Sequence, residues 1–139
     1  MNEPTKIDFH HRRVRDLGDV TDLVAMLFPG NRNQQHAAAR ILLALKTEDD
    51  LLGSLAFLEE QHGISRRTLQ RGRAKLSRLG LIERVSWMNA RYGGREGWKL
   101  SSRMSSSLRR LADWVDRWRD ISDASQVEKE DMLAGLLKP

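Results

Sequence analysis

Residues 63–85 read GISRRTLQRGRAKLSRLGLIERV and contain the clearest signals for where helices and strands begin and end. Gly63 stands two residues before Ser65, and Gly80 follows the last leucine of a helical pattern. Glycine tolerates the left-handed backbone that ends many helices, and serine accepts hydrogen bonds from the free amides that begin one. We therefore expect one helix to end at Gly63, a second helix to run from Ser65 to residue 79, and a strand to start at Leu81.

The expected helix at 65–79 sorts its side chains into two faces. At 100° per residue, Leu69, Leu76 and Leu79 fall on one side and the arginines on the other. Arginine reads guanine and glutamine reads adenine in a major groove about 12 Å wide, and a small alanine allows close approach. Thr68 and Lys75 flank this face towards phosphates. The candidate DNA contacts on this helix are Ser65, Arg66, Arg67, Thr68, Gln70, Arg71, Ala74, Lys75 and Arg78.

Positive charge is concentrated in this part of the chain. Residues 63–103 hold eleven Lys or Arg against two Glu, a net charge of +9. The whole chain of 139 residues carries +5, so the remainder carries −4. A charge-rich helix face is often merely solvated, but such faces usually mix signs, whereas residues 65–79 hold six basic residues and no acid. This pattern favours a polyanionic partner.

A basic hairpin is expected directly after the helix. Residues 81–88 have the composition of a strand, residues 89–97 contain three glycines, and residues 98–101 form the returning strand. Glycines at the tip allow close backbone approach, and arginines favour a narrow minor groove. A basic turn can also serve solubility alone. The candidate contacts at the tip are Arg91, Tyr92, Gly93, Gly94 and Arg95.

The turn Gly63-Ile64-Ser65, the leucines of the helix and the exit Gly80-Leu81-Ile82 resemble the winged helix-turn-helix superfamily of DNA-binding proteins. The resemblance covers about residues 34–101. It includes bacterial and archaeal transcription regulators and the DNA-binding domains of phage and plasmid replication or partition proteins. It implies a recognition helix in the major groove and a wing on the backbone or minor groove. Two positions depart from the usual pattern, because Glu59 replaces a small residue and Arg73 an apolar one. We expect these two side chains to form a salt bridge or to remain weakly exposed.

The fold class is therefore α+β, mostly α: a winged helix-turn-helix with helical extensions at both ends. Residues 1–18 are expected to be a flexible polar arm, residues 19–101 the DNA-binding domain with a short preceding helix, and residues 102–139 a helical extension. Further helices are expected at 20–28, at 34–46 with Asn33 as its cap, at 54–62, at 102–121 and at 127–137.

The helix expected at 102–121 carries an apolar stripe. Its members are spaced by four and three residues, as in a coiled-coil heptad. Trp114 and Ile121 widen the stripe, and charges of both signs decorate the other faces. The helix can pack on its own domain or pair with a second copy; we expect a homodimer that reads a near-palindromic site. The expected dimer contacts are Met104, Leu108, Leu111, Val115 and Trp118.

Other classes of protein find little support in the residues. No apolar run reaches the roughly 18–20 residues of a membrane span, and residues 1–13 lack an apolar core, so we expect neither a membrane span nor a secretory signal. The absence of cysteine fits a reducing cytoplasm, where we expect a nucleoid-associated protein. The acidic pair Asp49-Asp50 lacks the partners of a nuclease, so we expect neither an enzyme nor a metal or cofactor.

The residues favour sequence-specific binding of double-stranded DNA by a transcription regulator. A replication or partition factor of a mobile element is the alternative within DNA binding. A protein–protein adaptor is the alternative from another class, because winged helices also serve that use. A small-molecule effector is compatible with the sequence, but no residue requires one.

Overall fold

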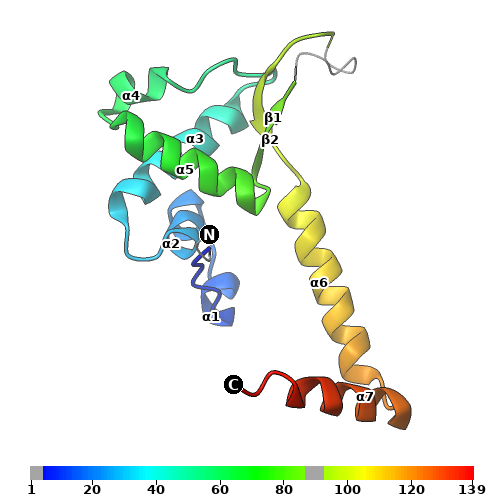
Figure 1. Cartoon of the computed structure of the whole chain (residues 1–139). Coiled ribbons are helices and arrows are strands. Elements are labelled where there is room, and N and C mark those ends of the chain that lie inside the picture. The colour runs from blue at the N-terminus through cyan, green and yellow to red at the C-terminus, as the bar shows by residue number, and fades with distance from the viewer. Residues whose placement is uncertain (1–4, 87–92) are drawn as a thin grey trace. The chain divides into compact units, whose positions relative to one another are not determined.

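The computed structural model describes residues 5–86 and 93–139. The chain forms two compact units, Met1–Met104 and Ser105–Pro139. The protein is mostly helical and contains one two-stranded antiparallel sheet, as the sequence predicts. The elements of the first unit are α1 (His11–Arg15), α2 (Val20–Leu27), α3 (Arg32–Thr47), α4 (Phe57–His62), α5 (Arg66–Leu79), β1 (Ile82–Val85) and β2 (Gly97–Leu100), as Figure 1 shows.

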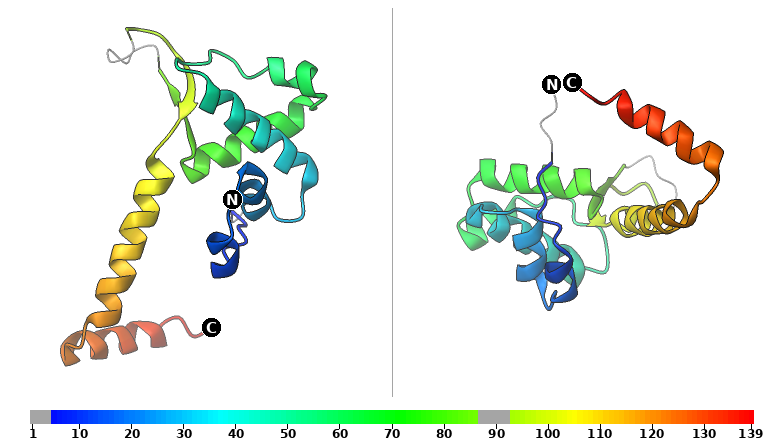
Figure 2. Two further views of the ribbon diagram at one scale, coloured as in Figure 1. Left: turned by 180° about the vertical axis from the view of Figure 1, so that it is seen from behind. Right: turned by 90° about the horizontal axis from the view of Figure 1, so that it is seen from below.

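Helix α3 lies at the centre of the first unit. It packs against α2, α5 and β2, and α5 crosses it in the views of Figures 1 and 2. Its buried side chains recur at the helical spacing that the sequence predicts, and they are Ala37, Ala38, Ile41, Leu42 and Leu45. The cap differs from the expectation: α3 begins two residues earlier than predicted, and Asn31, not Asn33, accepts the hydrogen bond from the Gln34 amide at 3.1 Å.

Small residues bring α5 close to α3. Gly72 is buried on α5, and a Cβ atom added to it would lie 3.6 Å from the Cβ of Ala37 and 3.7 Å from the amide nitrogen of Ala38. These are ordinary van der Waals distances, so the backbones approach closely without strain. Leu69 and Leu76 fill the space on either side of Gly72.

The sheet follows α5 directly. β1 and β2 pair from Ile82–Leu100 to Val85–Gly97. Leu52 pairs with the outer edge of β2, since its amide and carbonyl bond the carbonyl and amide of Trp98 at 3.1 and 2.7 Å. A Cβ on Gly97 would lie 2.7 Å from the Leu52 carbonyl oxygen, so this approach requires glycine.

The N-terminal segment differs from the expected flexible arm. Ile7 packs against the core, the amide of Asp8 donates to the Met26 carbonyl at 2.9 Å, and residues 11–15 form α1. Residues 1–4 lie outside the described part of the chain. Residues 5–8 are therefore attached to the end of α2.

The second unit consists of most of α6 (Arg103–Asp120) and of α7 (Ala124–Gly135). Neither helix contains a buried residue. The indole N–H of Trp118 donates to both carboxylate oxygens of Glu130, each at 3.1 Å. Across the described ranges, no helix is long and apolar enough to cross a membrane.

Candidate nucleic-acid interface

Both ends of α5 are fixed by the residues that the sequence predicts. The Ser65 hydroxyl accepts a hydrogen bond from the Thr68 amide at 3.1 Å and donates to the Thr68 hydroxyl at 2.8 Å. Gly63 and Gly80 both adopt the left-handed conformation, with φ of 64° and 83°. The hydroxyl groups of Ser65 and Thr68 thus bond each other and the helix backbone at the start of α5.

The outer face of α5 carries unpaired positive charge. Its exposed residues are Arg66, Arg67, Gln70, Arg71, Ala74 and Arg78. Within residues 5–86 and 93–139, no ion pair joins any arginine of α5 to an acid. The buried side of the same helix holds Leu69, Gly72 and Leu76. The separation into a cationic and an apolar face that the sequence predicts is thus present in the structure.

Lys75 occupies a different position from the expected phosphate contact. Its ammonium donates to the carbonyl of Lys6 at 2.7 Å and to the carbonyl of Leu27, and it lies 4.6 Å from the centre of the Phe28 ring. Leu27 is the last residue of α2, so Lys75 satisfies a carbonyl that the helix leaves unpaired. Burial, followed by repulsion from Arg78, lowers the pKa of Lys75. This placement argues against Lys75 as a DNA contact.

Arg73 likewise turns away from the exposed face. Its guanidinium lies 5.1 Å from the centre of the Trp98 ring on β2, a cation–π contact that links α5 to the sheet. In the described part of the chain no salt bridge connects Arg73 to Glu59; both residues are half-buried, which fits the second of the two expected arrangements. Trp98 is half-buried and packs against the core, as a structural tryptophan does.

The basic residues in the described part of the hairpin and directly after it form ion pairs, in contrast to the arginines of α5. Glu83 lies 3.4 Å from the Lys99 ammonium and 3.2 Å from the Arg103 guanidinium. Arg84 lies 3.5 Å from Glu96, and Arg95 forms an ion pair with Asp50. Much of the charge that the sequence assigns to the hairpin is therefore balanced within the fold. The unbalanced charge of the segment is concentrated on α5.

An open groove of about 650 Å³ runs between α5, the start of α4 and the sheet. Arg66, Gln70 and Arg73 line it from α5, and Arg84 lines it from β1. Glu59 contributes the acid on its α4 side. Arg73 contacts Trp98 and Arg84 contacts Glu96, so within the described part of the chain Arg66 is the guanidinium of this groove that is available to a phosphate.

The predicted tip of the hairpin is described in part. Arg91 and Tyr92 lie outside the described residues. Gly93 and Gly94 are exposed, with φ of 62° and 78°, and form the turn that leads into β2. Arg95, also exposed, is engaged with Asp50.

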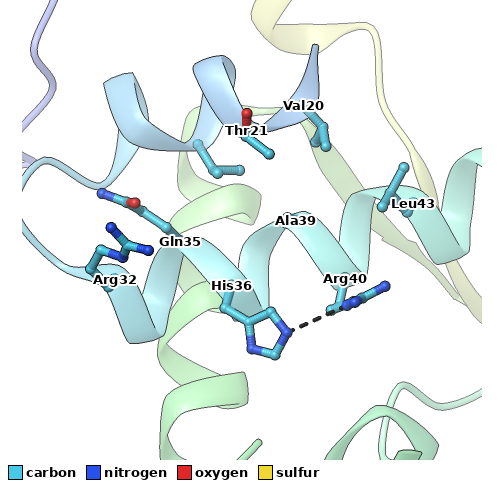
Figure 3. A pocket seen from close by; sticks show the side chains of 9 residues that line it. Val20, Thr21, Arg32, Gln35, His36, Ala39, Arg40 and Leu43 are labelled. Atoms are coloured by element: carbon cyan, nitrogen blue, oxygen red, sulfur yellow. Dashed lines mark hydrogen bonds between the residues drawn. The ribbon is translucent and has the colours of Figure 1, made fainter. Parts of the chain in front are cut away.

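A second hollow, of about 560 Å³, lies between α2 and α3 (Figure 3). Arg32, His36 and Arg40 line it at intervals of four residues, and the Arg40 Nε donates to His36 at 3.4 Å. His62 at the end of α4 lies 6.4 Å from His36, ring to ring. Burial, then the charge of Arg40 and then that of His36, lower the pKa of His62. None of the described residues form a group of His, Asp or Glu suited to holding a metal ion.

Comparison of the chain with protein-family models, with curated proteins and with solved structures found no significant match.

Proposed function

We propose that this protein binds double-stranded DNA in a sequence-specific manner through α5, as a transcription regulator with a winged helix-turn-helix domain. In this proposal α4 and α5 are the two helices of the motif, α5 enters the major groove, and the β1–β2 hairpin is the wing. Two observations support this proposal. A helix, a tight turn, a basic helix and a hairpin follow one another in the chain, and small residues let α5 pack closely against α3.

One observation carries the proposal: among the described residues, the arginines on the outer face of α5 have no acidic partner, whereas Arg84 and Arg95 of the hairpin do. Keeping several like charges on one helix face without counterions raises the free energy of the folded chain through repulsion. A polyanion relieves this repulsion and gains from release of its condensed cations. Gln70 lies among these arginines and adds a side chain that can read a base edge.

Within this proposal α5 reads bases and the hairpin positions the protein. The groove beside Arg66 and Arg84 accepts the sugar-phosphate backbone next to the helix. A replication or partition factor of a mobile element uses the same interface and is the alternative role. A protein–protein adaptor is the alternative from another class, and it would require an acidic partner surface to balance the arginines on this face.

The proposal is tested by selecting from a random duplex library at several salt concentrations. A regulator enriches one motif, and its binding constant falls with salt with a logarithmic slope of about −3 or steeper, since each neutralised phosphate contributes about −0.9. Enrichment of no motif, or no duplex binding at moderate salt, contradicts the proposal. Nicked or cleaved product in the presence of magnesium would indicate a nuclease instead.

At residue level, Arg71→Ala is expected to weaken binding to the selected site by roughly 5- to 150-fold, which corresponds to about 1–3 kcal/mol per lost base contact, and to relax the preference at one base position. Arg110→Ala on α6 is the matched control, because it removes another exposed arginine outside the proposed DNA interface. Arg91→Ala, in the segment that the sequence predicts to form the hairpin tip, is expected to weaken all duplexes alike. Equal, sequence-independent losses from Arg71→Ala and Arg91→Ala contradict base reading by α5.

A further inference from the structure

Helix α6 has a broad face that carries apolar side chains and almost no charge. Leu108 and Val115 occupy one heptad position, Leu111 and Trp118 the next, and Trp114 and Ile121 flank them. These six side chains are 40–57% exposed. The charges lie at the remaining positions of the helix, at Arg109, Arg110, Asp113, Asp116, Arg117 and Asp120. Met104, which the sequence adds to this stripe, packs instead against the core of the first unit.

The polar groups at the margin of this face are turned away or satisfied. Arg119, the charged residue beside the stripe, reaches the carboxylate of Asp116 at 3.2 Å. The N–H of Trp118 is bonded to Glu130, so its ring presents apolar surface. The rings of Trp114 and Trp118 are nearly parallel, at 10°, with their centres 6.2 Å apart. The face is therefore ordered and ready to exclude water.

The second unit does not bury these side chains by itself. It spans 35 residues, 105–139, and neither of its helices contains a buried residue. Units below about 40 residues rarely fold without disulfides, metals or association with another chain, and isolated helices of this length are marginal in water. The stability of α6 thus requires a partner surface.

We propose that a second copy of this chain is that partner, and that the two α6 helices pair through the uncharged face between Leu108 and Ile121. The six half-exposed side chains offer on the order of 600 Å² of surface, close to the roughly 800 Å² that each partner contributes to a standard interface. Identical stripes with heptad spacing fit each other knobs-into-holes about a two-fold axis.

Charge also favours a second copy over a partner of opposite charge. Residues 105–139 hold six basic and seven acidic residues, a net charge of −1, so two copies meet with little repulsion. The face itself offers no charge through which an acidic or a basic partner could be selected. Pairing of α6 requires no DNA, so an experiment without DNA tests the dimer separately from the proposed DNA binding.

The test is sedimentation of the full-length protein without DNA, from about 1 to 100 µM, a range that spans micromolar dissociation constants. A dimer of twice the monomer mass of 16.0 kDa is expected at the upper end, with helicity at 222 nm rising with concentration as α6 is stabilised. A monomer throughout the range, or a species larger than a dimer, overturns the proposal.

Leu111→Glu places a charge at the centre of the face and is expected to abolish the dimer. Leu111 is 57% exposed, so the substitution leaves the core of the first unit intact, which its unchanged thermal transition checks. Met132→Glu on α7 is the matched control: Met132 is 70% exposed and lies outside the face, so this variant is expected to remain dimeric. A dimeric Leu111→Glu variant, or equal dissociation of the Met132→Glu variant, overturns the assignment of the interface to α6.

Discussion

Replacing Lys75 tests how the first unit is held together. Lys75→Met keeps most of the apolar length of the side chain but removes the ammonium that joins α5 to the end of α2 and to residue 6. Leu27 is fully buried, at 0% exposure, and no water can easily replace the lost donor at its carbonyl. The carbonyl of Lys6 is on an exposed residue and can be solvated. The stability of the variant thus depends mainly on the Leu27 contact.

The magnitude follows from these contacts. A buried acceptor left unsatisfied costs about 1–3 kcal/mol, and loss of the cation–π contact with Phe28 adds about 0.5–2 kcal/mol. Removing the cation also recovers part of the burial cost that lowers the pKa of Lys75. We therefore expect a net loss of about 2 kcal/mol in the free energy of unfolding. For a chain of this size that corresponds to a fall in Tm of roughly 5–10 °C.

The assay is thermal and urea unfolding followed by circular dichroism, with Arg71→Met as the matched control. Arg71 lies on the exposed face of the same helix, so its replacement is expected to change stability by less than about 0.5 kcal/mol. Hydrogen exchange supplies a local measurement: in Lys75→Met the amide of Asp8, bonded to the Met26 carbonyl, is expected to lose protection. A Lys75→Met variant as stable as Arg71→Met, with Asp8 still protected, would refute the reasoning.

Three further perturbations are expected to affect stability in defined directions. Gly72→Ala is expected to stabilise the protein by about 0.5–1 kcal/mol in urea unfolding, because its Cβ finds ordinary contact distances and alanine favours the helix; a destabilised variant would contradict the close-contact geometry. Gly97→Ala is expected to destabilise by about 1–3 kcal/mol, since its Cβ meets the Leu52 carbonyl at 2.7 Å, and wild-type stability would show that the Leu52 pairing is dispensable. The pKa of His62 is lower in the folded state than in the unfolded chain. As pH falls below about 6.5, the unfolded chain therefore binds a proton at His62 before the folded protein does, and the free energy of unfolding decreases. His62→Gln should therefore lose less stability than wild type between pH 7.5 and 5.5, and an equal loss would exclude His62 as a cause.

Local sequence signals predicted α5 and its surroundings well. The cap at Ser65 and the left-handed glycines at positions 63 and 80 are confirmed, because these signals act through hydrogen bonds and backbone conformations within a few residues. The buried stripe of α3 is confirmed for a similar reason, since its helical period is written in consecutive residues. The start of α3 was predicted two residues too late, because Asn31 and Asn33 are both suitable caps and the fold uses Asn31.

Which group each basic side chain contacts depends on the tertiary structure. Within the single basic segment, Lys75 bonds carbonyls 48 and 69 residues away, Arg73 covers Trp98, and Arg95 meets Asp50 45 residues away. Sequence composition sums all of these residues as one positive segment, because it contains no information on which acids or carbonyls the fold brings within hydrogen-bonding distance. Residue identity and helical period alone place cationic side chains on one face of α5 and apolar side chains on the other. The folded arrangement of the described residues then distinguishes the arginines that stay exposed without an acidic partner from the basic residues that contact the protein's own carbonyls, rings and carboxylates.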